Sequence, residues 1–366
     1  MGIRRTGKTQ VIKRALLKHT AATGGAIAYL DVSNYTSLHQ FYSNLWAALP
    51  HTLMQTTVDL LQATGSVPDK IVNWFRGHID KVKVPGFELD LHSPQDISAR
   101  LPWQPVAQAL LQAVDAVEDR ASLPVIGLDE LPFLLQNLFD RRASPQEVTV
   151  ALATLRQLRD AGLRMVIGGS ISLESLLSLH NISHTVLGGL RREWIPPFTA
   201  EEARIYLDKR LDGLPAAPSV AVALSALPDW VPDFLNETAR YLRVLPTAAV
   251  MDDEVLYAMR HQVLPAIHAS FVKQFEERLA LHYVAGELSA AEALLDSVAV
   301  EGGIGSALAS RALNPSERRA LMRLQSDMFL IEADGFGYRF SLNVLRQWWC
   351  KHRGLADGAS EVTSHA

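Results

Sequence analysis

The stretch that decides the fold opens the chain and reads Gly2-Ile3-Arg4-Arg5-Thr6-Gly7-Lys8-Thr9. It fits the pattern G-x-x-x-x-G-K-[ST] of a phosphate-binding loop. The two glycines let the backbone curl so that successive N–H groups point inward and form a nest for an anion. Lys8 can reach the outer phosphates of a nucleotide, and the Thr9 hydroxyl can ligate Mg²⁺. A helix over residues 8–20 would place the positive end of its dipole beneath the phosphates.

The loop therefore predicts a nucleotide site. Its cofactor-binding residues are Gly2, Arg4, Arg5, Thr6, Gly7, Lys8 and Thr9. A loop of this kind normally follows a buried β-strand, yet only Met1 precedes Gly2. We expect the first core strand to be missing from this sequence and the natural N-terminus to lie further upstream. A shortened chain, or another segment in the same slot, are the alternatives.

Composition points to a globular protein with a sizeable core. The chain has 366 residues, of which 48% are hydrophobic and 20% charged, and its formal net charge is −4. That charge predicts no global attraction to nucleic acid or membranes. The single cysteine, Cys350, excludes an internal disulfide and a cysteine-based metal site. We expect a cytoplasmic protein, because such compartments are reducing and no apolar run reaches the ~20 residues of a membrane span.

A second informative stretch is Leu123-Pro124-Val125-Ile126-Gly127-Leu128-Asp129-Glu130, a hydrophobic strand that ends in two acids. Ligands of parallel α/β sheets bind at the carboxyl ends of the strands, so these acids would lie beside the phosphate loop. Asp129 would hold Mg²⁺ together with Thr9, and Glu130 would orient the attacking water. The alternative is a strand that merely ends in a polar turn.

The remaining core elements follow the same α/β pattern. A short apolar run predicts a strand over 26–32, and helices are predicted over 37–49, 103–118 and 145–162. The next strand, residues 163–170, ends in Ser170, a candidate to contact the γ-phosphate or the attacking water. Residues 191–198 are predicted as a last core strand, and Thr199 with Glu202 as a capping box that starts a helix to about 211.

The predicted domains are an ATPase core over 1–212 with an insertion at 51–101, a helical lid over 213–269, a winged helix over 270–353, and a disordered tail over 354–366. Within the insertion, 51–75 is predicted helical and 82–91 a hairpin or edge strand. The winged helix is predicted from helices near 271–284, 290–300, 304–313 and 316–326, followed by two short extended stretches, 328–332 and 338–341, and a last helix over 342–351. The residues between the extended stretches, Ala333-Asp334-Gly335-Phe336-Gly337, suit a hairpin turn.

The last 44 residues before the tail are locally basic. Residues 310–353 hold eight Lys and Arg against four Asp and Glu. Arg318, Arg319 and Arg323 fall on the predicted recognition helix, where they could contact DNA phosphates. The alternative is a winged helix that binds protein or simply packs.

Together these residues resemble the archaeal-type ATPases related to the STAND and AAA+ P-loop families. The double arginine in the loop looks like that family's G-x-R-R-x-G-K-T/S pattern, and the strand that ends at Asp129-Glu130 looks like its Walker B strand. Met165-Val166-Ile167-Gly168-Gly169-Ser170 is similar to its sensor strand, and Ile195-Pro196-Pro197-Phe198-Thr199 to the entry of its lid. Leu345-Arg346-Gln347-Trp348-Trp349 is similar to the ending of relatives with a C-terminal winged helix.

The resemblance implies ATP and Mg²⁺ as cofactors, slow hydrolysis, and a nucleotide-controlled switch coupled to the winged helix, to a partner protein or to a second copy of the chain. Lys8, Glu130 and Ser170 would be the catalytic residues. Four arginines could supply an arginine finger: Arg141, Arg142, Arg191 and Arg192. The competing hypothesis is a non-hydrolysing scaffold or DNA-binding regulator that acts through the winged helix.

Overall fold

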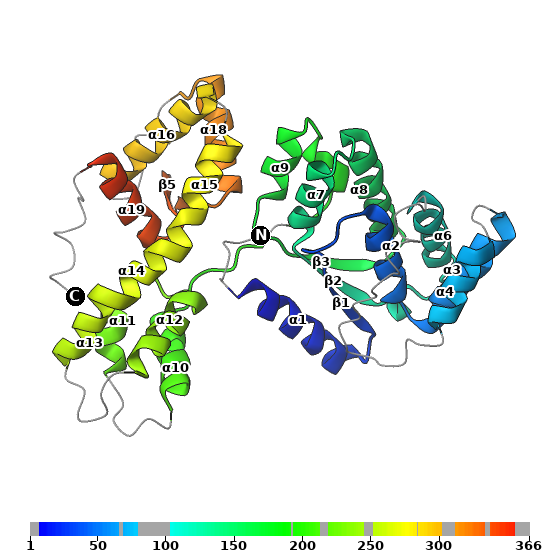
Figure 1. Ribbon diagram of the computed structural model, residues 1–366, viewed down its shortest axis with the longest axis horizontal. Coiled ribbons are helices and arrows are strands. Elements are labelled where there is room, and N and C mark those ends of the chain that lie inside the picture. Colours follow the sequence, from blue (N-terminus) through cyan, green and yellow to red (C-terminus); the bar gives the residue numbers. More distant parts are fainter. Residues whose placement is uncertain are drawn as a thin grey trace. The chain divides into compact units, whose positions relative to one another are not determined.

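The computed structural model describes residues 7–65, 69–79, 103–191, 193–212, 219–244, 252–283, 285–301, 312–333 and 337–355. These residues form two compact units: the first holds Lys8 to Glu193, and the second holds Gly7 and the described residues from Trp194 onward. Each unit has its own cluster of buried hydrophobic side chains. Figure 1 shows a small sheet with helices on both faces in the first unit and a mainly helical second unit.

The sheet of the first unit has three parallel strands in the order β1-β2-β3. They are β1 (Ile27–Asp31), β2 (Val125–Asp129) and β3 (Arg164–Ile167), which lie where the sequence predicted strands. Because side chains alternate along a strand, Leu30, Ile126 and Leu128 point into the large core. The alternate residues, among them Tyr29, Gly127 and Asp129, therefore share the opposite face.

Helix α1 (Lys8–Thr23) covers that opposite face (Figure 1). It buries Ile12 and Leu16 against Val125 in a small cluster of their own. Gly127 permits this close approach, because a Cβ at that position would lie 2.8 Å from the Ile12 side chain and 2.9 Å from that of Leu16. The absence of a side chain at Gly127 thus allows α1 to lie at this short distance from the sheet.

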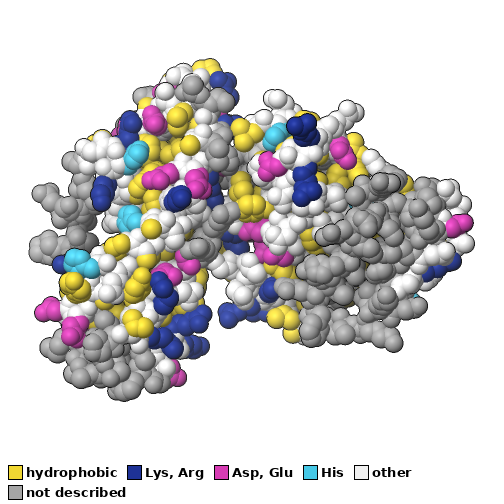
Figure 2. Space-filling view, in the orientation of Figure 1, with side chains coloured by type: hydrophobic (Ala, Val, Ile, Leu, Met, Phe, Trp, Pro, Cys, Tyr) yellow, Lys and Arg dark blue, Asp and Glu magenta, His cyan; other side chains and the backbone are white. Residues whose placement is uncertain are grey.

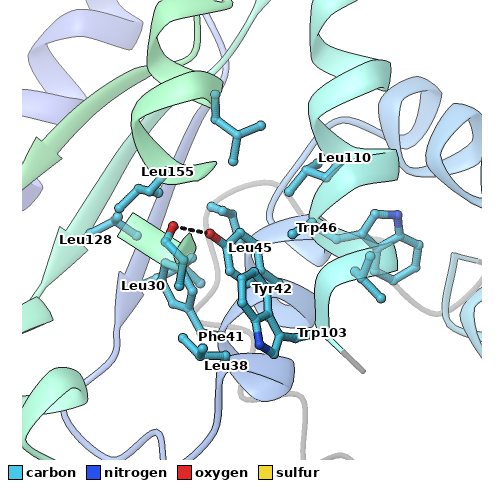
Figure 3. Packing of buried hydrophobic residues seen from close by; sticks show 14 of the residues in the cluster. Leu30, Leu38, Phe41, Tyr42, Leu45, Trp46, Trp103, Leu110, Leu128 and Leu155 are labelled. Atoms are coloured by element: carbon cyan, nitrogen blue, oxygen red, sulfur yellow. Dashed lines mark hydrogen bonds between the residues drawn. The ribbon is translucent and has the colours of Figure 1, made fainter. Parts of the chain in front are cut away.

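Seven of the described helices build the large core on the other face: α2 (Leu38–Ala47), α3 (His51–Thr64), α4 (Asp69–Ile79), α6 (Trp103–Asp115), α7 (Leu131–Asp140), α8 (Pro145–Asp160) and α9 (Leu173–Leu179). Tyr42 joins three of them, as Figure 3 shows. Its ring stacks on Trp103 at 5.2 Å, and its hydroxyl donates a hydrogen bond of 2.7 Å to the carbonyl oxygen of Ala151. The predicted hairpin at 82–91 lies outside the described residues.

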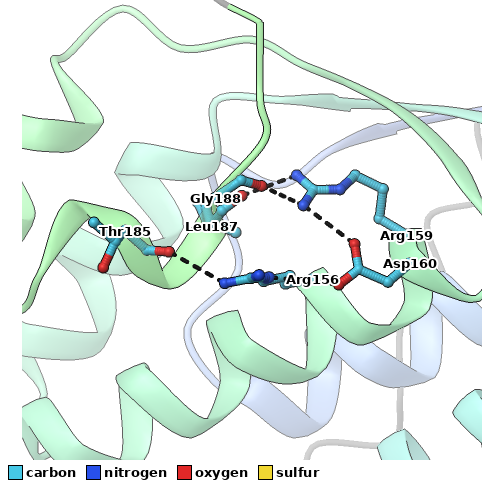
Figure 4. Close-up of polar contacts among 6 residues, drawn as sticks. All are labelled: Arg156, Arg159, Asp160, Thr185, Leu187 and Gly188. Carbon is cyan, nitrogen blue, oxygen red and sulfur yellow. Dashed lines mark hydrogen bonds and ion pairs between the residues drawn. The ribbon is translucent and has the colours of Figure 1, made fainter.

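The chain after β3 is held against α8 by two arginines (Figure 4). It forms α9 (Leu173–Leu179) and a 3₁₀ turn, η2 (His184–Leu187). Arg159 donates to the carbonyl oxygens of Leu187, at 2.9 Å, and Gly188, while Arg156 reaches that of Thr185 at 3.5 Å. Arg159 thus supplies donors to the carbonyl oxygens of Leu187 and Gly188 at the end of the turn, whereas the Thr185 oxygen also accepts the Gly188 N–H at 2.9 Å.

The predicted strand over 191–198 is wrong for the residues that the structure describes there, Arg191 and Glu193–Phe198, which form no strand. Pro196 and Pro197 have no N–H to give to a strand ladder. Phe198 instead donates its N–H to the carbonyl oxygen of Trp230, at 2.8 Å, inside the second unit. The following helix, α10 (Ala200–Leu211), begins at the predicted capping box of Thr199 and Glu202.

The second unit continues with α11 (Val220–Ser225), α12 (Pro232–Leu242), α13 (Asp252–Ala258), α14 (Leu264–Ile267), α15 (Lys273–His282) and α16 (Ala285–Val300). The π-helical turns Met259–Val263 and His268–Val272 flank α14. Pro265 explains why regular α-helix is interrupted there, because it lacks an N–H and its ring crowds the preceding turn. Three α10 side chains belong to the core of this unit: Ala203, Leu207 and Leu211.

The chain ends in α18 (Pro315–Ser326), an antiparallel hairpin of β4 (Leu330–Ala333) and β5 (Gly337–Phe340), and α19 (Asn343–Arg353). The predicted hairpin and last helix are therefore present, and the helix predicted over 304–313 falls almost entirely outside the described residues. Indole N–H groups fix α19, since Trp348 donates to Glu276 at 3.1 Å and Trp349 to Asp296 at 2.9 Å. The division into lid and winged helix stays a prediction.

Candidate nucleotide site

Thr9 and Asp129 meet although 120 residues separate them. Thr9 lies in the first turn of α1, and its hydroxyl donates to Asp129 Oδ2 at 2.5 Å. Asp129 is the last residue of β2, on the face that α1 covers, and is 1% exposed. The pair predicted as Mg²⁺ ligands is thus assembled by the packing of one helix on one strand.

A third side chain joins this pair. Tyr29, in the middle of β1, donates its hydroxyl to the same Asp129 Oδ2 at 2.8 Å. The other oxygen, Oδ1, is buried and has no hydrogen-bond partner in the described part of the chain. Gly168 makes room for it, because a Cβ there would lie 2.6 Å from Oδ1. A buried carboxylate oxygen without a donor is costly and suits a site that receives a cation.

Gly7 and Lys8, the part of the phosphate-loop pattern next to Thr9 that the structure describes, stand directly before α1 and at its start. Gly7 has a φ of +83°, a left-handed conformation that favours glycine, and Lys8 begins α1. Lys8 is only 6% exposed, beside Thr9 at the positive end of the helix dipole. The other predicted loop residues, Gly2, Arg4, Arg5 and Thr6, lie outside the described residues.

Glu130 and Ser170 contact each other directly. The Glu130 carboxylate accepts a hydrogen bond of 2.8 Å from the Ser170 N–H and a second one from the Ser170 hydroxyl. Ser170 follows β3 and is 5% exposed. Glu130 has a φ of 61° at the start of α7, a conformation that few non-glycine residues adopt. The two predicted catalytic residues thus lie together. In the described structure the hydrogen bonds to the Asp129 carboxylate come from other side chains, those of Thr9 and Tyr29.

Electrostatics keep Tyr29 a hydrogen-bond donor. Burial raises the pKa of the Tyr29 hydroxyl far above its usual value, and the neighbouring Asp129 carboxylate raises it further. The Lys13 ammonium lies over the face of the Tyr29 ring, 4.4 Å from its centroid. The raised pKa keeps the Tyr29 hydroxyl protonated, so it can donate to Asp129.

Two features of the site were missed in the sequence. Tyr29 looked like one more apolar residue of a buried strand, and α7, directly after Glu130, was not anticipated. The signal for α7 was present in Leu131, Leu134, Leu135 and Leu138, which are all buried at helical spacing. Nothing in the sequence pairs Tyr29 with a carboxylate 100 residues away.

The donor set fits Mg²⁺ better than a metal held by protein alone. Among the described residues, no three His, Cys, Asp or Glu side chains gather around one point. Mg²⁺ commonly binds through one or two protein oxygens, several waters and the phosphates of its substrate. Thr9 and the unpartnered oxygen of Asp129 supply such a partial oxygen set.

The three arginines predicted to contact DNA differ in their exposure to solvent and in their ion pairs. Arg323 is 12% exposed and forms an ion pair of 2.7 Å with Glu287. Arg319 is exposed and lies 3.6 Å from the same Glu287, while Arg318 is exposed. Acidic and basic side chains are interspersed on the visible face of this unit in Figure 2. The described helices include none that is both long and apolar enough to cross a membrane.

Comparison with known proteins places the fold. No family model matches the sequence, and no curated protein matches it either. The structure is similar to that of a Walker-type ATPase of Pyrococcus abyssi, with a TM-score of 0.54 and 15% sequence identity. The match covers 95% of this chain and 89% of the other. The protein therefore has the α/β fold of a Walker-type ATPase.

Proposed function

We propose that the first unit binds ATP with Mg²⁺ and hydrolyses it slowly, as a nucleotide-controlled switch. The observation that carries the proposal is the hydrogen bond between Thr9 and Asp129, which joins the end of the phosphate-loop pattern to the end of a buried strand. Lys8 at the start of α1 adds the charge that phosphate oxygens need. The similarity in fold to a Walker-type ATPase supports the same reading.

Each residue has one role in this proposal. Lys8 and the N–H groups at the start of α1 bind the phosphates, and Thr9 with Asp129 holds the ion. Bound Mg²⁺ would neutralise charge that develops on the phosphate oxygens. Glu130 orients the attacking water and polarises it, for which its carboxylate must leave one of its contacts with Ser170. Ser170 then remains close to the reacting phosphate.

The test compares two substitutions with matched controls. Lys8→Ala should abolish nucleotide binding, whereas Lys18→Ala, an exposed lysine on the same helix, should leave it unchanged. Glu130→Gln should keep binding and lower turnover about 100-fold or more, the usual contribution of a general base. Glu118→Gln, which changes an exposed glutamate of the same unit, is its control. Normal turnover in Glu130→Gln would contradict the assigned role.

A second candidate is a non-hydrolysing regulator that binds DNA through the C-terminal residues. The exposed positions of Arg318 and Arg319 on α18 favour it. Arg323 contributes less, because it is occupied by Glu287. If Lys8→Ala and Glu130→Gln leave function in cells intact while a double Ala substitution of Arg318 and Arg319 destroys it, this candidate replaces the first.

We further propose that one more strand pairs with β3. Within the described residues the outer edge of β3 has no neighbouring strand. Val166 is 39% exposed there, although parallel sheets normally bury both faces. A chain extended upstream in its reading frame by about 20 residues, enough for a strand and its lead-in, should protect the β3 amides from hydrogen exchange and raise ATP affinity. Unchanged exchange would contradict the proposal.

A further inference from the structure

We propose that Tyr29 is a positioning residue that holds the Asp129 carboxylate in the orientation that binds Mg²⁺. The inference rests on the proposed function, since it concerns the same site. It adds a residue that lies outside both the phosphate-loop pattern and the two acids at the end of β2.

Two donors from different elements share one oxygen of the Asp129 carboxylate. In the described structure the hydrogen bonds to this carboxylate come from Thr9 on α1 and Tyr29 on β1, and both reach Oδ2. Thr9 is itself a proposed ligand of the ion, so its one hydroxyl would serve both the ion and Asp129 when the ion binds. Tyr29 has no such second task, and its bond can hold the carboxylate in both states.

The Tyr29 side chain is itself fixed in place by its neighbours. It pairs in register with Gly127, and its ring packs beside that residue: a Cβ there would lie 3.5 Å from Tyr29 Cδ2, an ordinary contact distance. Lys13 covers the ring from α1. The hydroxyl is therefore held towards Asp129 by strand, sheet and helix together, as a preorganised site requires.

The same arrangement leaves the second oxygen of the Asp129 carboxylate, Oδ1, open for an ion. With both donors on Oδ2, Oδ1 stays buried and without a hydrogen-bond partner among the described residues. A carboxylate free to rotate would exchange its two oxygens and bring Oδ1 to a donor. The hydroxyl of Tyr29 opposes that rotation, and the arrangement keeps one oxygen unsatisfied before any ion is present.

Loss of the Tyr29 hydroxyl should therefore weaken Mg²⁺ binding specifically. Removing a hydrogen-bond partner of a metal ligand typically lowers metal affinity about 10- to 100-fold. Nucleotide affinity without Mg²⁺ should stay the same, because it depends on Lys8 and on backbone N–H groups rather than on Asp129. A purely structural role would lower stability and leave the Mg²⁺ dependence unchanged.

The experiment titrates Mg²⁺ into the full chain in the presence of an ATP analogue with a fluorescent ribose label, with EDTA for the metal-free baseline. Three proteins are compared: wild type, Tyr29→Phe and Tyr42→Phe. Tyr42→Phe is the matched control, because it removes a tyrosine hydroxyl that donates to Ala151, in the same unit but in the large core. Temperature is kept well below the unfolding midpoint of each protein.

We expect Tyr29→Phe to raise the Mg²⁺ concentration at half-saturation at least about ten-fold, with an unchanged baseline and no change in Tyr42→Phe. Equal Mg²⁺ dependence in wild type and Tyr29→Phe overturns the inference and leaves the ATPase proposal standing. An equal shift in both variants also overturns it, as a general effect of weakened packing. A wild type that binds no analogue with or without Mg²⁺ overturns the proposed function and this inference together.

Discussion

At the scale of single residues, the site depends on side chains that are absent as much as on those present. Gly168 lies against Asp129 Oδ1 and the tip of Ile12, each 2.6 Å from where its Cβ would be. No methyl group fits there without moving the carboxylate or α1. The glycine thus connects the position of Asp129 to the packing of the helix that carries Thr9.

We predict that Gly168→Ala lowers the free energy of unfolding by roughly 1–3 kcal/mol, the usual cost of overpacking a buried position. Gly77→Ala is the control, because nothing lies within 4 Å of a Cβ at that exposed position in α4. It should stabilise the protein by about 0.5–1 kcal/mol, since alanine restricts the unfolded chain more than glycine. Urea unfolding of both variants measures the difference. Equal stabilities of the two variants would show that the sheet and α1 move apart and accept the added methyl group without cost.

Glu130 illustrates a different constraint at this scale. Its left-handed backbone has a cost for a residue with a side chain, of order 1 kcal/mol or more. The two hydrogen bonds from Ser170 offset that cost. We predict that Ser170→Ala destabilises the protein by about 1–3 kcal/mol through loss of the hydroxyl to a charged acceptor, and that Ser175→Ala, in α9, costs less. Calorimetric unfolding midpoints of the two variants decide the matter.

At the scale of elements, α19 shows how one segment caps another that is far away in sequence. Its N-cap residue, Leu342, offers no side-chain acceptor. Asp229 supplies one instead, and accepts the N–H groups of Asn343 at 3.0 Å and Val344 at 2.8 Å. Burial raises the pKa of the Asp229 carboxyl to about 6, against the opposing effect of these N–H groups and of Arg339.

This cap makes the stability of the second unit depend on pH. A folded pKa of about 6, raised from the usual 3.8, means that the folded state binds the proton more tightly than the unfolded one. Stability from this group is therefore complete below pH 3.8 and is lost as pH rises through 6. We predict that the free energy of unfolding of wild type, relative to Asp229→Asn, increases between pH 7 and pH 5. Urea titrations across this range measure it, and a flat difference would contradict the assignment.

At the scale of the whole molecule, the described residues separate into two units with separate cores. The boundary bears on α10, which the sequence assigned to the ATPase core over 1–212. Its side chains Ala203, Leu207 and Leu211 are buried in the core of the second unit. A unit with its own core is expected to fold alone.

We predict that a fragment of residues 194–366 unfolds cooperatively, and that a fragment of residues 213–366 is clearly less stable. The shorter fragment loses two buried leucines of α10, each worth about 1.5–3 kcal/mol. Circular dichroism during urea unfolding compares the two. If the shorter fragment is as stable as the longer one, α10 belongs with the first unit and the predicted boundary at 212 holds.

The sequence alone determined the parts that depend on local pattern. Apolar runs gave the three strands of the sheet, and Thr199 with Glu202 gave the start of α10, because these signals act over a few residues. The phosphate-loop pattern and the two acids at the end of the Val125–Asp129 strand singled out Lys8, Thr9, Asp129 and Glu130 as candidates. Local pattern was wrong where two prolines followed an extended stretch, at residues 191–198.

Only the tertiary structure decided which distant residues share a contact. Tyr29 on Asp129 and Asp229 on α19 join segments that are 100 and 115 residues apart. No periodicity encodes such pairs, because they arise only when two strands pair, or when a loop packs on the start of a helix, in the folded chain. Tertiary packing also leaves the Arg323 side chain only 12% exposed, in an ion pair with Glu287. Motif spacing thus singled out candidate residues, and the packing of α1, β1 and β2 brought Thr9 and Tyr29 to Asp129.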